Sequence, residues 1–577
     1  MTSRDKFGCL FGFASLLIPA AVGQDQRQEY EADAPKTILQ LQQFRQASSI
    51  HVKSRSGRQG TATLVDLNPA INAWYLLTLQ WNDSRETTYH LENANPRDAK
   101  LVLDQKDPSG LLILEANHRY SCDPFDALAQ GQAAALVFYP LCDGRIYLRN
   151  PAAGHSTTLE EATEFLREHV WGGEKIIALG HILMGDAHLE TGKVETEPGA
   201  GVSAQQGDGV PLAAAIDPRF RDRLLASANL GIDLEGPART GLTPGAWYAA
   251  RANPGVYVSI LQPNLINPPI LTSYRAFVNN LDNVEAAALC YLVAFDLDRF
   301  ELGYARGTEH PKVGWSDHIL ERMKDPKLPG PDGIATISPL IATGLVSPED
   351  AGKTVATFIG GFKREQGAFK YGDLALRNHG SHYGFIENGV VFSKLQPGLA
   401  TVYVLEDGSL GMKTWTDADN QLLKRVRHAR QNGVPVIEFD PACKTGVPGP
   451  LVNRWGAGNW SGSENMKLRT MRSGLALAQN HGKRFLIYAV FSDATPSAMA
   501  RIFQAYRCDY AMLLDMNALE HTYLALYRRS GSQLFVDHLV KGMSVLEKSA
   551  SGEIVPRFLG YADNRDFFYM VRTERKQ

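Results

Sequence analysis

The sequence lacks two features that would each have assigned it to a broad class. Its 577 residues carry 59 Lys and Arg against 62 Asp and Glu, so the formal net charge is only -3, and no basic block stands out. Without such an electrostatic footprint we expect no nucleic-acid partner. Beyond the N-terminus, no run reaches the roughly 18 apolar residues of a membrane-spanning helix, so we expect no stable membrane insertion.

Several short motifs are also missing. The sequence contains no G-x-S-x-G elbow, phosphate-binding P-loop, dinucleotide fingerprint or H-E-x-x-H helix, which excludes the commonest hydrolase, nucleoside-triphosphatase, oxidoreductase and zinc-protease classes. No CxxC pair or His/Cys cluster has the spacing of a zinc site. We therefore expect neither a metal nor a cofactor.

The N-terminus has the three parts of a secretory signal. Arg4 and Lys6 precede an apolar run, Phe7–Val22, and small residues follow at the cleavage point near Gln24. The run is short and rich in Gly, Ser and Pro, which favours a signal peptide over residues 1–23 rather than a spanning helix. The alternative is a buried N-terminal hairpin. The signal predicts a secreted or periplasmic protein.

Removing the signal peptide leaves five cysteines. In an oxidising compartment Cys122 and Cys142, which lie in two turn-like segments, are predicted to form a disulfide that closes a loop of about 20 residues. Cys290 and Cys508 lie among apolar residues and are predicted to fill the core.

Composition divides the rest of the chain into three parts. Short strand-like runs between turns predict an N-terminal β-rich or mixed accessory domain over residues 24–189. A stretch poor in large apolar residues predicts a linker or mobile loop over residues 190–235. Strand-like runs and a helical pattern over Asp417–Gln431 then predict a mixed-sheet α/β (α+β) domain over residues 236–577.

The clearest local unit runs from Arg484 to Asp515. An apolar strand is followed by Thr495 as helix N-cap, Pro496 at the first helical position, and a second apolar strand that ends at Asp515. This pattern predicts a strand-helix-strand crossover between a parallel pair. Asp515 would then lie at a carboxyl-terminal strand edge, where open α/β sheets bind ligands.

Three blocks in this half of the chain occur in an order that resembles the phosphodiester glycosidase family. They are Phe358–Phe362, similar to the family's Asn-Gly-Gly-Phe-Phe turn, Arg472–Ala476, similar to its Arg-(Thr/Ser)-Ala-Ile-Gly strand, and Leu513–Asp515, similar to the start of its Leu-Asp-Gly-Gly-Gly-Ser. The resemblance covers roughly residues 240–577. It implies a glycoside hydrolase that acts on sugar phosphodiesters.

The resemblance also implies roles for single residues. Arg472 would bind the phosphate, because a guanidinium matches the geometry of phosphate oxygens. Asp515 would be the carboxylate near the anomeric centre, where positive charge develops as the glycosidic bond breaks. Gly360 and Gly361 would contribute to the substrate site. The alternative is that Arg472 and Asp515 form a structural ion pair at a strand end.

The sequence departs from the family pattern at the site itself. Ile359 replaces the family's Asn, and Met516-Asn517-Ala518 replaces three glycines that would admit close backbone approach to a ligand. Either the site has been rebuilt with polar side chains or the chemistry has been lost. In the first case the polar side chains would be those of Asn517, Glu520 and His521.

Two further segments carry candidate site residues. Arg377, His379 and His382 lie in a polar run, where His382 is a candidate general acid or base, although a solvated turn explains the same composition. Trp455 and Trp460, among glycines, suit stacking against a sugar ring, and simple packing is the alternative.

Two functions are therefore carried forward. The first is a secreted hydrolase that cleaves a sugar from a phosphodiester or related extracellular glycan. The second is a non-catalytic glycan-binding or envelope-associated protein that retains the fold. In both, the partner is a carbohydrate.

Overall fold

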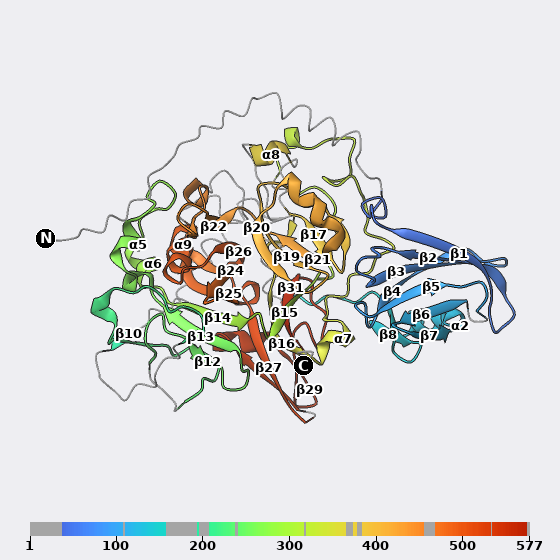
Figure 1. The fold of residues 1–577 in the computed structure, drawn as a ribbon, viewed down its shortest axis with the longest axis horizontal. Coiled ribbons are helices and arrows are strands. Elements are labelled where there is room, and N and C mark those ends of the chain that lie inside the picture. The colour runs from blue at the N-terminus through green and yellow to red at the C-terminus, as the bar shows by residue number, and fades with distance from the viewer. Residues whose placement is uncertain are drawn as a thin grey trace.

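The computed structural model of the chain consists mainly of β-strands that form several antiparallel sheets (Figure 1). It describes residues 37–107, 110–156, 193–195, 207–236, 241–316, 319–364, 373–377, 383–454, 468–531 and 533–573. The expected signal peptide, residues 1–23, lies outside the described residues. None of the helices in these ranges is long and apolar enough to cross a membrane.

The N-terminal module contains a six-stranded sheet in the order β1-β2-β3-β4-β9-β8, a three-stranded sheet β5-β6-β7 and one helix (Figure 1, blue). Its elements are β1 (Gln46–Lys53), β2 (Gln59–Asp66), β3 (Trp74–Trp81), β4 (Thr87–Asn93), β5 (Ala99–Leu103), β6 (Leu111–Glu115), β7 (His118–Cys122), α2 (Phe125–Ala133), β8 (Phe138–Leu141) and β9 (Ile146–Arg149). In β2, Ala62 and Leu64 are buried while Thr61 and Thr63 are partly exposed. This alternation, typical of a half-buried strand, gives the module a core of its own.

The predicted disulfide between Cys122 and Cys142 is present. It joins the last residue of β7 to the residue after β8, with the two Cα atoms 5.7 Å apart. Cys290 and Cys508 are both buried, as predicted for core-filling thiols. The disulfide links the three-stranded sheet to the edge of the six-stranded sheet.

One face of the N-terminal module packs directly against the rest of the chain. The guanidinium of Arg149 forms a buried ion pair with Glu92 and lies 4.2 Å from the ring centroid of Trp74. His90 Nδ1 accepts a hydrogen bond of 2.9 Å from the backbone N–H of Ile341. Arg149 Nη2 also donates to the Ile341 carbonyl at 3.3 Å, so hydrogen bonds from His90 and Arg149 join the module to this segment of the main part.

The main part of the chain contains an eight-stranded antiparallel sheet in the order β12-β13-β14-β25-β24-β26-β22-β23. Its strands are β12 (Tyr248–Ala249), β13 (Val256–Leu261), β14 (Cys290–Asp296), β22 (Pro435–Asp440), β23 (Thr445–Pro448), β24 (Thr470–Asn480), β25 (Lys483–Ala494) and β26 (Tyr510–Met516). The short helices α5 (Pro268–Thr272) and α6 (Asn283–Ala287) precede β14. Pairs of named strands in the described ranges are antiparallel, so at this level the fold is α+β.

The predicted crossover is present as β25, helix α9 (Pro496–Ala505) and β26. The Thr495 hydroxyl caps the helix by accepting from the Ala498 N–H at 3.3 Å, as the sequence predicts. However, β25 and β26 are not paired, because β24 lies between them and runs antiparallel to both. The carboxyl ends of β25 and β26 therefore share one sheet edge with the start of β24.

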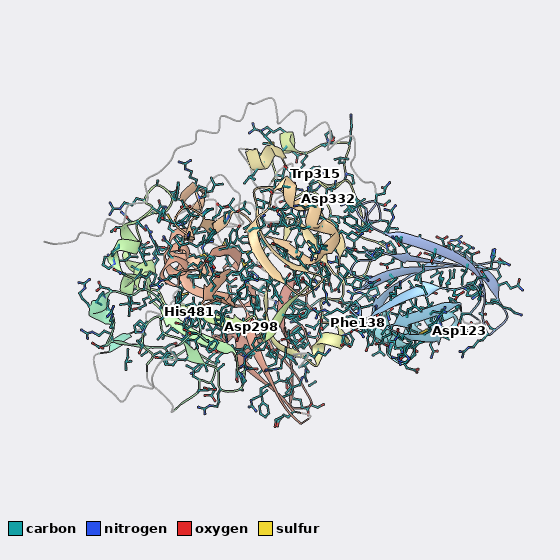
Figure 2. The ribbon with its side chains drawn as sticks, viewed as in Figure 1. Asp123, Phe138, Asp298, Trp315, Asp332 and His481 are labelled. Atoms are coloured by element: carbon teal, nitrogen blue, oxygen red, sulfur yellow. A yellow bond between two sulfur atoms is a disulfide. The ribbon has the colours of Figure 1, made fainter. Side chains whose placement is uncertain are left out.

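The opposite edge of the same sheet contains the β24–β25 turn. His481 lies in that turn, and Asp298 lies in the turn that follows β14, close to it in Figure 2. A hydrogen bond of 3.0 Å from the Leu297 N–H to the Arg484 carbonyl joins the two turns. This edge is well separated from Asp515.

Two five-stranded sheets complete the main part, in the orders β15-β31-β16-β27-β28 and β18-β17-β21-β19-β20. Their strands are β15 (Phe300–Ala305), β16 (Thr354–Ile359), β17 (Phe385–Glu387), β18 (Val390–Ser393), β19 (Ala400–Leu405), β20 (Leu410–Thr414), β21 (Val426–Gln431), β27 (Leu524–Ser530), β28 (Gln533–His538) and β31 (Phe567–Arg572). Outside these sheets lie α7 (Pro348–Ala351), α8 (Asp373–Arg377) and the hairpin of β29 (Lys548–Ala550) and β30 (Glu553–Val555). The hairpin projects at the bottom of Figure 1.

The prediction of one helix over Asp417–Gln431 is wrong. Asp417–Arg425 forms a 3-10 helix and Val426–Gln431 forms strand β21 between β17 and β19. Pairing with two neighbouring strands outweighs the weak helical preference of this polar segment.

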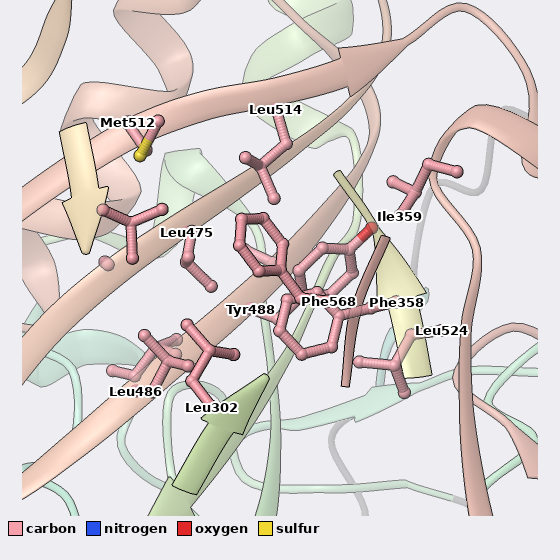
Figure 3. Packing of buried hydrophobic residues seen from close by; sticks show 14 of the residues in the cluster. Leu302, Phe358, Ile359, Leu475, Leu486, Tyr488, Met512, Leu514, Leu524 and Phe568 are labelled. Carbon is pink, nitrogen blue, oxygen red and sulfur yellow. The ribbon is translucent and has the colours of Figure 1, made fainter. Parts of the chain in front are cut away.

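Aromatic rings fill the space between the sheets (Figure 3). Phe358 of β16 lies with its ring centroid 4.8 Å from Tyr488 of β25 and 5.6 Å from Phe568 of β31. Leu475 and Leu514 extend the contact along the large sheet, and all five side chains are buried. Burial on this scale makes the two sheets one packed unit.

The segment expected to be a linker, residues 190–235, is only partly described. Strand β10 (Lys193–Glu195) pairs with β11 (Leu224–Ala226), and Leu225 and Ile232 are buried in the main core. In its described part, this segment therefore packs on the core.

Removing the Cys122–Cys142 bond should destabilise the N-terminal module. The loop spans 20 positions, and for a loop of this length the entropy of the unfolded chain predicts a loss of about 3 kcal/mol. Urea unfolding of the Cys122→Ser/Cys142→Ser variant, followed by circular dichroism, measures the change. An unchanged midpoint in the double variant would contradict the prediction.

Candidate functional site

The candidate site lies at the sheet edge where β26 ends and β24 begins. Arg472 of β24 is opposite Met516 of β26, so Arg472 and Asp515 come from neighbouring strands. In the facing sheet, Ile359 of β16 pairs with Phe567 of β31. The residues that follow β16 and precede β31 therefore reach the same region.

Asp515 is buried and its carboxylate is held on both oxygens. Oδ2 accepts from Arg565 Nη1 at 2.6 Å, and Oδ1 accepts from the backbone N–H of Met516 at 2.8 Å. The Ser473 hydroxyl donates to the Asp515 carbonyl oxygen at 2.8 Å. Among the residues that the structure describes, Asp515 thus forms its ion pair with Arg565, a residue that the sequence interpretation missed, and not with Arg472.

Arg472 is fully buried next to Asp515 but is oriented by backbone carbonyls. Its Nε donates to the Ala494 carbonyl at 2.7 Å and its Nη2 to the Leu468 carbonyl at 3.0 Å. The Met516 sulfur lies 2.8 Å from Nη1. Burial lowers the pKa of Arg472 to about 9, against the opposing influence of nearby carboxylates. The Arg472 guanidinium therefore remains a cation at neutral pH, and its Nη1 is in contact with the Met516 thioether.

Gly360 and Gly361 make room for a buried ion pair. A Cβ at position 360 would come within 2.6 Å of Asp566 Oδ2, and one at position 361 within 2.8 Å of Arg430 Cζ. The Gly360 N–H donates to the Asp566 carbonyl at 2.9 Å. The glycine pair is therefore required by the close packing of charged side chains. The sequence analysis had instead expected these two glycines to contribute to the substrate site.

Asp566 is the most enclosed carboxylate of this region. Its Oδ2 accepts from Arg430 Nε at 2.8 Å and from the Tyr304 hydroxyl at 3.2 Å, and His310 Nδ1 lies 3.1 Å from its Oδ1. Burial alone would raise the pKa of Asp566, yet Arg430 and His310 hold it well below its ordinary value. Asp566 is an anion throughout the physiological range.

A third buried ion pair lies beside the first two. Arg557 binds Asp563 through Nε at 2.7 Å and through Nη2 at 3.2 Å, and its Nη1 donates to the Glu520 carbonyl at 2.8 Å. The Arg565 N–H donates to Asp563 Oδ1 at 2.9 Å. One sequence signal was available for these residues, since the charged run Asp563-Asn564-Arg565-Asp566 directly precedes an apolar strand.

The segment after Asp515 keeps one property of the glycines it replaces. Asn517 has φ of 85°, in the left-handed region that Asn adopts more readily than other non-glycine residues. Its N–H donates to the Met471 carbonyl at 2.8 Å, and its side-chain oxygen accepts from Thr470 at 3.1 Å. His521 Nδ1 lies 2.8 Å from the Met516 carbonyl oxygen. The turn is therefore held by side chains.

Glu520 and His521 sit together at the rim of the site. Glu520 is buried, with an oxygen 3.9 Å from His521 Nε2, and the His521 side chain is partly exposed. This part of the structure brings together five of the predicted residues, namely Arg472, Asp515, Asn517, Glu520 and His521.

The other candidate residues are not all placed. His379, His382, Trp455 and Trp460 lie outside the described residues, and only the backbone of Arg377, at the end of α8, is described. Their roles stay predictions. Within the described ranges, no group of three or more His, Cys, Asp or Glu side chains is arranged to hold a metal ion.

The site is therefore rich in fixed charge. Three carboxylates, Asp515, Asp563 and Asp566, pair with the guanidinium groups of Arg565, Arg557 and Arg430. Such an arrangement holds carboxylates in fixed orientations, which suits stabilisation of charge that develops in a reaction. The same arrangement stabilises a fold when no reaction occurs.

Replacing Asp566 with Asn should strongly destabilise the protein, because it leaves the Arg430 cation buried without its counter-charge. We expect a loss of about 3 kcal/mol in the free energy of unfolding at pH 7. Urea unfolding measures the change. Asp407→Asn, at an exposed carboxylate 3.8 Å from Arg425, is the matched control and should change stability by less than about 1 kcal/mol.

The pH dependence of the same variant gives a second test. A carboxylate with a depressed pKa contributes stability above its unfolded pKa near 4 and loses that contribution as the pH falls toward its folded pKa. The wild type should therefore lose stability below about pH 4, and Asp566→Asn should lose less. Equal acid sensitivity in both proteins would contradict this account.

Comparison with known proteins returns only distant structures. No protein-family profile matches the chain, and no curated protein matches it. The catalytic domain of zebrafish N-acetylglucosamine-1-phosphodiester alpha-N-acetylglucosaminidase, auto-inhibited by its pro-peptide, is 11% identical over 56% of this chain and 85% of that chain, with a TM-score of 0.28. A hypothetical protein from Synechocystis is 10% identical over 86% of this chain and 97% of that chain, with a TM-score of 0.25. Similarities at these TM-scores carry no argument about fold or activity.

Proposed function

We propose that the protein is an exported hydrolase that cleaves a sugar from a phosphodiester or a related extracellular glycan. The observation that carries the proposal is the convergence of Arg472 and Asp515, from separate sequence blocks, on one edge of neighbouring strands. The disulfide Cys122–Cys142 supports export, because disulfides persist in oxidising compartments.

The reaction requires a cation for the phosphate and a carboxylate for the sugar. Arg472 supplies the cation, since its guanidinium stays charged at neutral pH. Asp515 supplies the carboxylate, and its contact with Arg565 at 2.6 Å fixes its orientation. Water attacks the anomeric carbon, the bond from that carbon to the phosphate oxygen breaks, and the phosphate leaves as a monoester that takes up the proton released by water.

A second function, glycan binding without turnover, is favoured by a different observation. Arg472 Nη1 lies 2.8 Å from the Met516 sulfur. The Nε and Nη2 of the same guanidinium donate to backbone carbonyls. Asp515 is likewise paired with Arg565. Groups held in this way can support a binding surface that performs no chemistry.

A release assay on a panel of sugar-1-phosphodiesters separates the two functions. We expect the wild type to release sugar from at least one diester and Asp515→Ala to reduce the rate by about 100-fold or more. Asp298→Ala is the matched control, because this exposed carboxylate lies at the opposite edge of the sheet and should leave the rate unchanged. Wild-type failure on every diester would contradict the hydrolase proposal.

Arg472→Lys tests the phosphate role separately. Lysine keeps the charge but lacks the planar fork, so we expect KM to rise by about tenfold, with a smaller change in kcat. Thermal unfolding of the variant checks that it is folded. Sugar binding without turnover, unchanged by Asp515→Asn, would support the glycan-binding function instead.

A further inference from the structure

A cavity of about 400 Å³ lies at the other end of β26, away from Asp515. It opens between β20 of one sheet and strands β22, β24, β25 and β26 of the large sheet. The groups that can contact a ligand there are Thr414, Glu438, Phe439, Arg484, Asp509 and Tyr510. A cavity of this size accommodates one or two sugar rings.

Hydrogen-bonding groups converge on the wall of this cavity. The Thr414 hydroxyl donates to Glu438 Oε1 at 2.5 Å and lies 3.0 Å from the Tyr510 hydroxyl. The Tyr510 ring is buried, and burial raises the pKa of its phenol, so the phenol is neutral at physiological pH. Thr414, Glu438 and Tyr510 together offer hydrogen-bond donors and acceptors. This suits a ligand whose hydroxyls both donate and accept hydrogen bonds.

The charged groups around the cavity carry a small excess of negative charge. Asp509 and Glu438 face Arg484 and Lys413, but Lys413 is bound to Asp419 at 2.6 Å, so three carboxylates stand against two cations. Arg484 Nη2 donates to the Leu410 carbonyl at 2.6 Å, which fixes the guanidinium at the wall. The excess carboxylate repels an anion such as a phosphate, and the fixed Arg484 guanidinium repels a positively charged ligand. This arrangement favours a neutral polar ligand.

An exposed aromatic ring completes the cavity. Phe439, at the rim, is 44% exposed, although it lies in strand β22 between two polar neighbours, Glu438 and Asp440. The apolar face of a pyranose ring can stack on such a ring while its hydroxyls reach the polar wall. Leu477 and Ala478 provide an apolar floor.

We propose that this cavity binds a neutral sugar ring, as a glycan site separate from the Asp515 edge. Tyr510 and Asp515 are five positions apart in strand β26, which corresponds to about 17 Å at the usual rise per residue. A single sugar therefore cannot contact both side chains. The proposal does not rest on the proposed function, because binding here requires no turnover.

Calorimetric titration of the full mature chain with neutral sugars tests the proposal. The panel is glucose, galactose, mannose and N-acetylglucosamine, each also as its methyl glycoside. We expect binding of at least one sugar, weakened about tenfold or more by Phe439→Ala and by Glu438→Gln. We also expect the bound sugar to slow hydrogen exchange in residues 435–440.

Matched controls separate this site from the Asp515 edge. Val545→Ala and Glu553→Gln alter an exposed apolar side chain and an exposed carboxylate outside the cavity, and Asp515→Asn alters the other site; all three should bind as the wild type does. No binding of any neutral sugar, full binding by both cavity variants, or preference for a sugar phosphate would each overturn the proposal. Failure of the wild type to release sugar from any diester, with neutral-sugar binding at the cavity retained, would refute only the proposed function.

Discussion

The buried ion pair between Arg430 and Asp566 is the interaction on which the main part of the structure depends. It joins β21 of one sheet to the start of β31 in another, under the Gly360–Gly361 turn that follows β16. Arg430 Nη2 also donates to the Phe362 carbonyl at 2.8 Å. Burial of either charge alone would be costly, so the two side chains must stay paired. The pair therefore fixes the two sheets that carry them in one arrangement.

The neighbouring groups extend this constraint to the large sheet. Asn432 follows β21 and donates to the Leu513 carbonyl at 2.7 Å, while its oxygen accepts from the Phe362 N–H at 3.2 Å. Asp515 lies two residues beyond Leu513. The position of the candidate carboxylate is thus set by side chains of a different sheet as well as by its own strand. A rigid frame of this kind is what a preorganised site requires, and equally what a binding site without chemistry would keep.

Local patterns in the sequence predicted the parts of the fold that depend on local contacts. The Thr495 cap and the helix that begins at Pro496 are both determined by neighbours a few positions away. The insertion of β24 between β25 and β26 is determined by pairing between distant segments, so the sequence pattern predicted the crossover but not its middle strand. The same reason explains β21, where two partner strands override a helical periodicity.

The candidate site shows the same division. Arg472 and Asp515 were found because each lies in a block that resembles a family motif, whereas Arg565, Asp563, Arg430 and His310 lie in no such block. Their importance comes from burial, and burial of a charged residue is not visible in a sequence unless its partner is known. The run of alternating charge before β31 was the available signal, and only the structure shows that each of its charged side chains is paired.

The contact between the N-terminal module and the main part has a consequence for how this chain can change in evolution. Trp74 of the module packs against Phe392 of the main part, with ring centroids 6.2 Å apart. The Gln42 side-chain amide donates to the Val391 carbonyl and accepts from the Val391 N–H. Loss of the module from the gene would uncover these apolar and polar groups together. The stability of the main part therefore depends on the module that covers it, and a substitution at Gln42 or Trp74 alters the surroundings of Val391 and Phe392 as well.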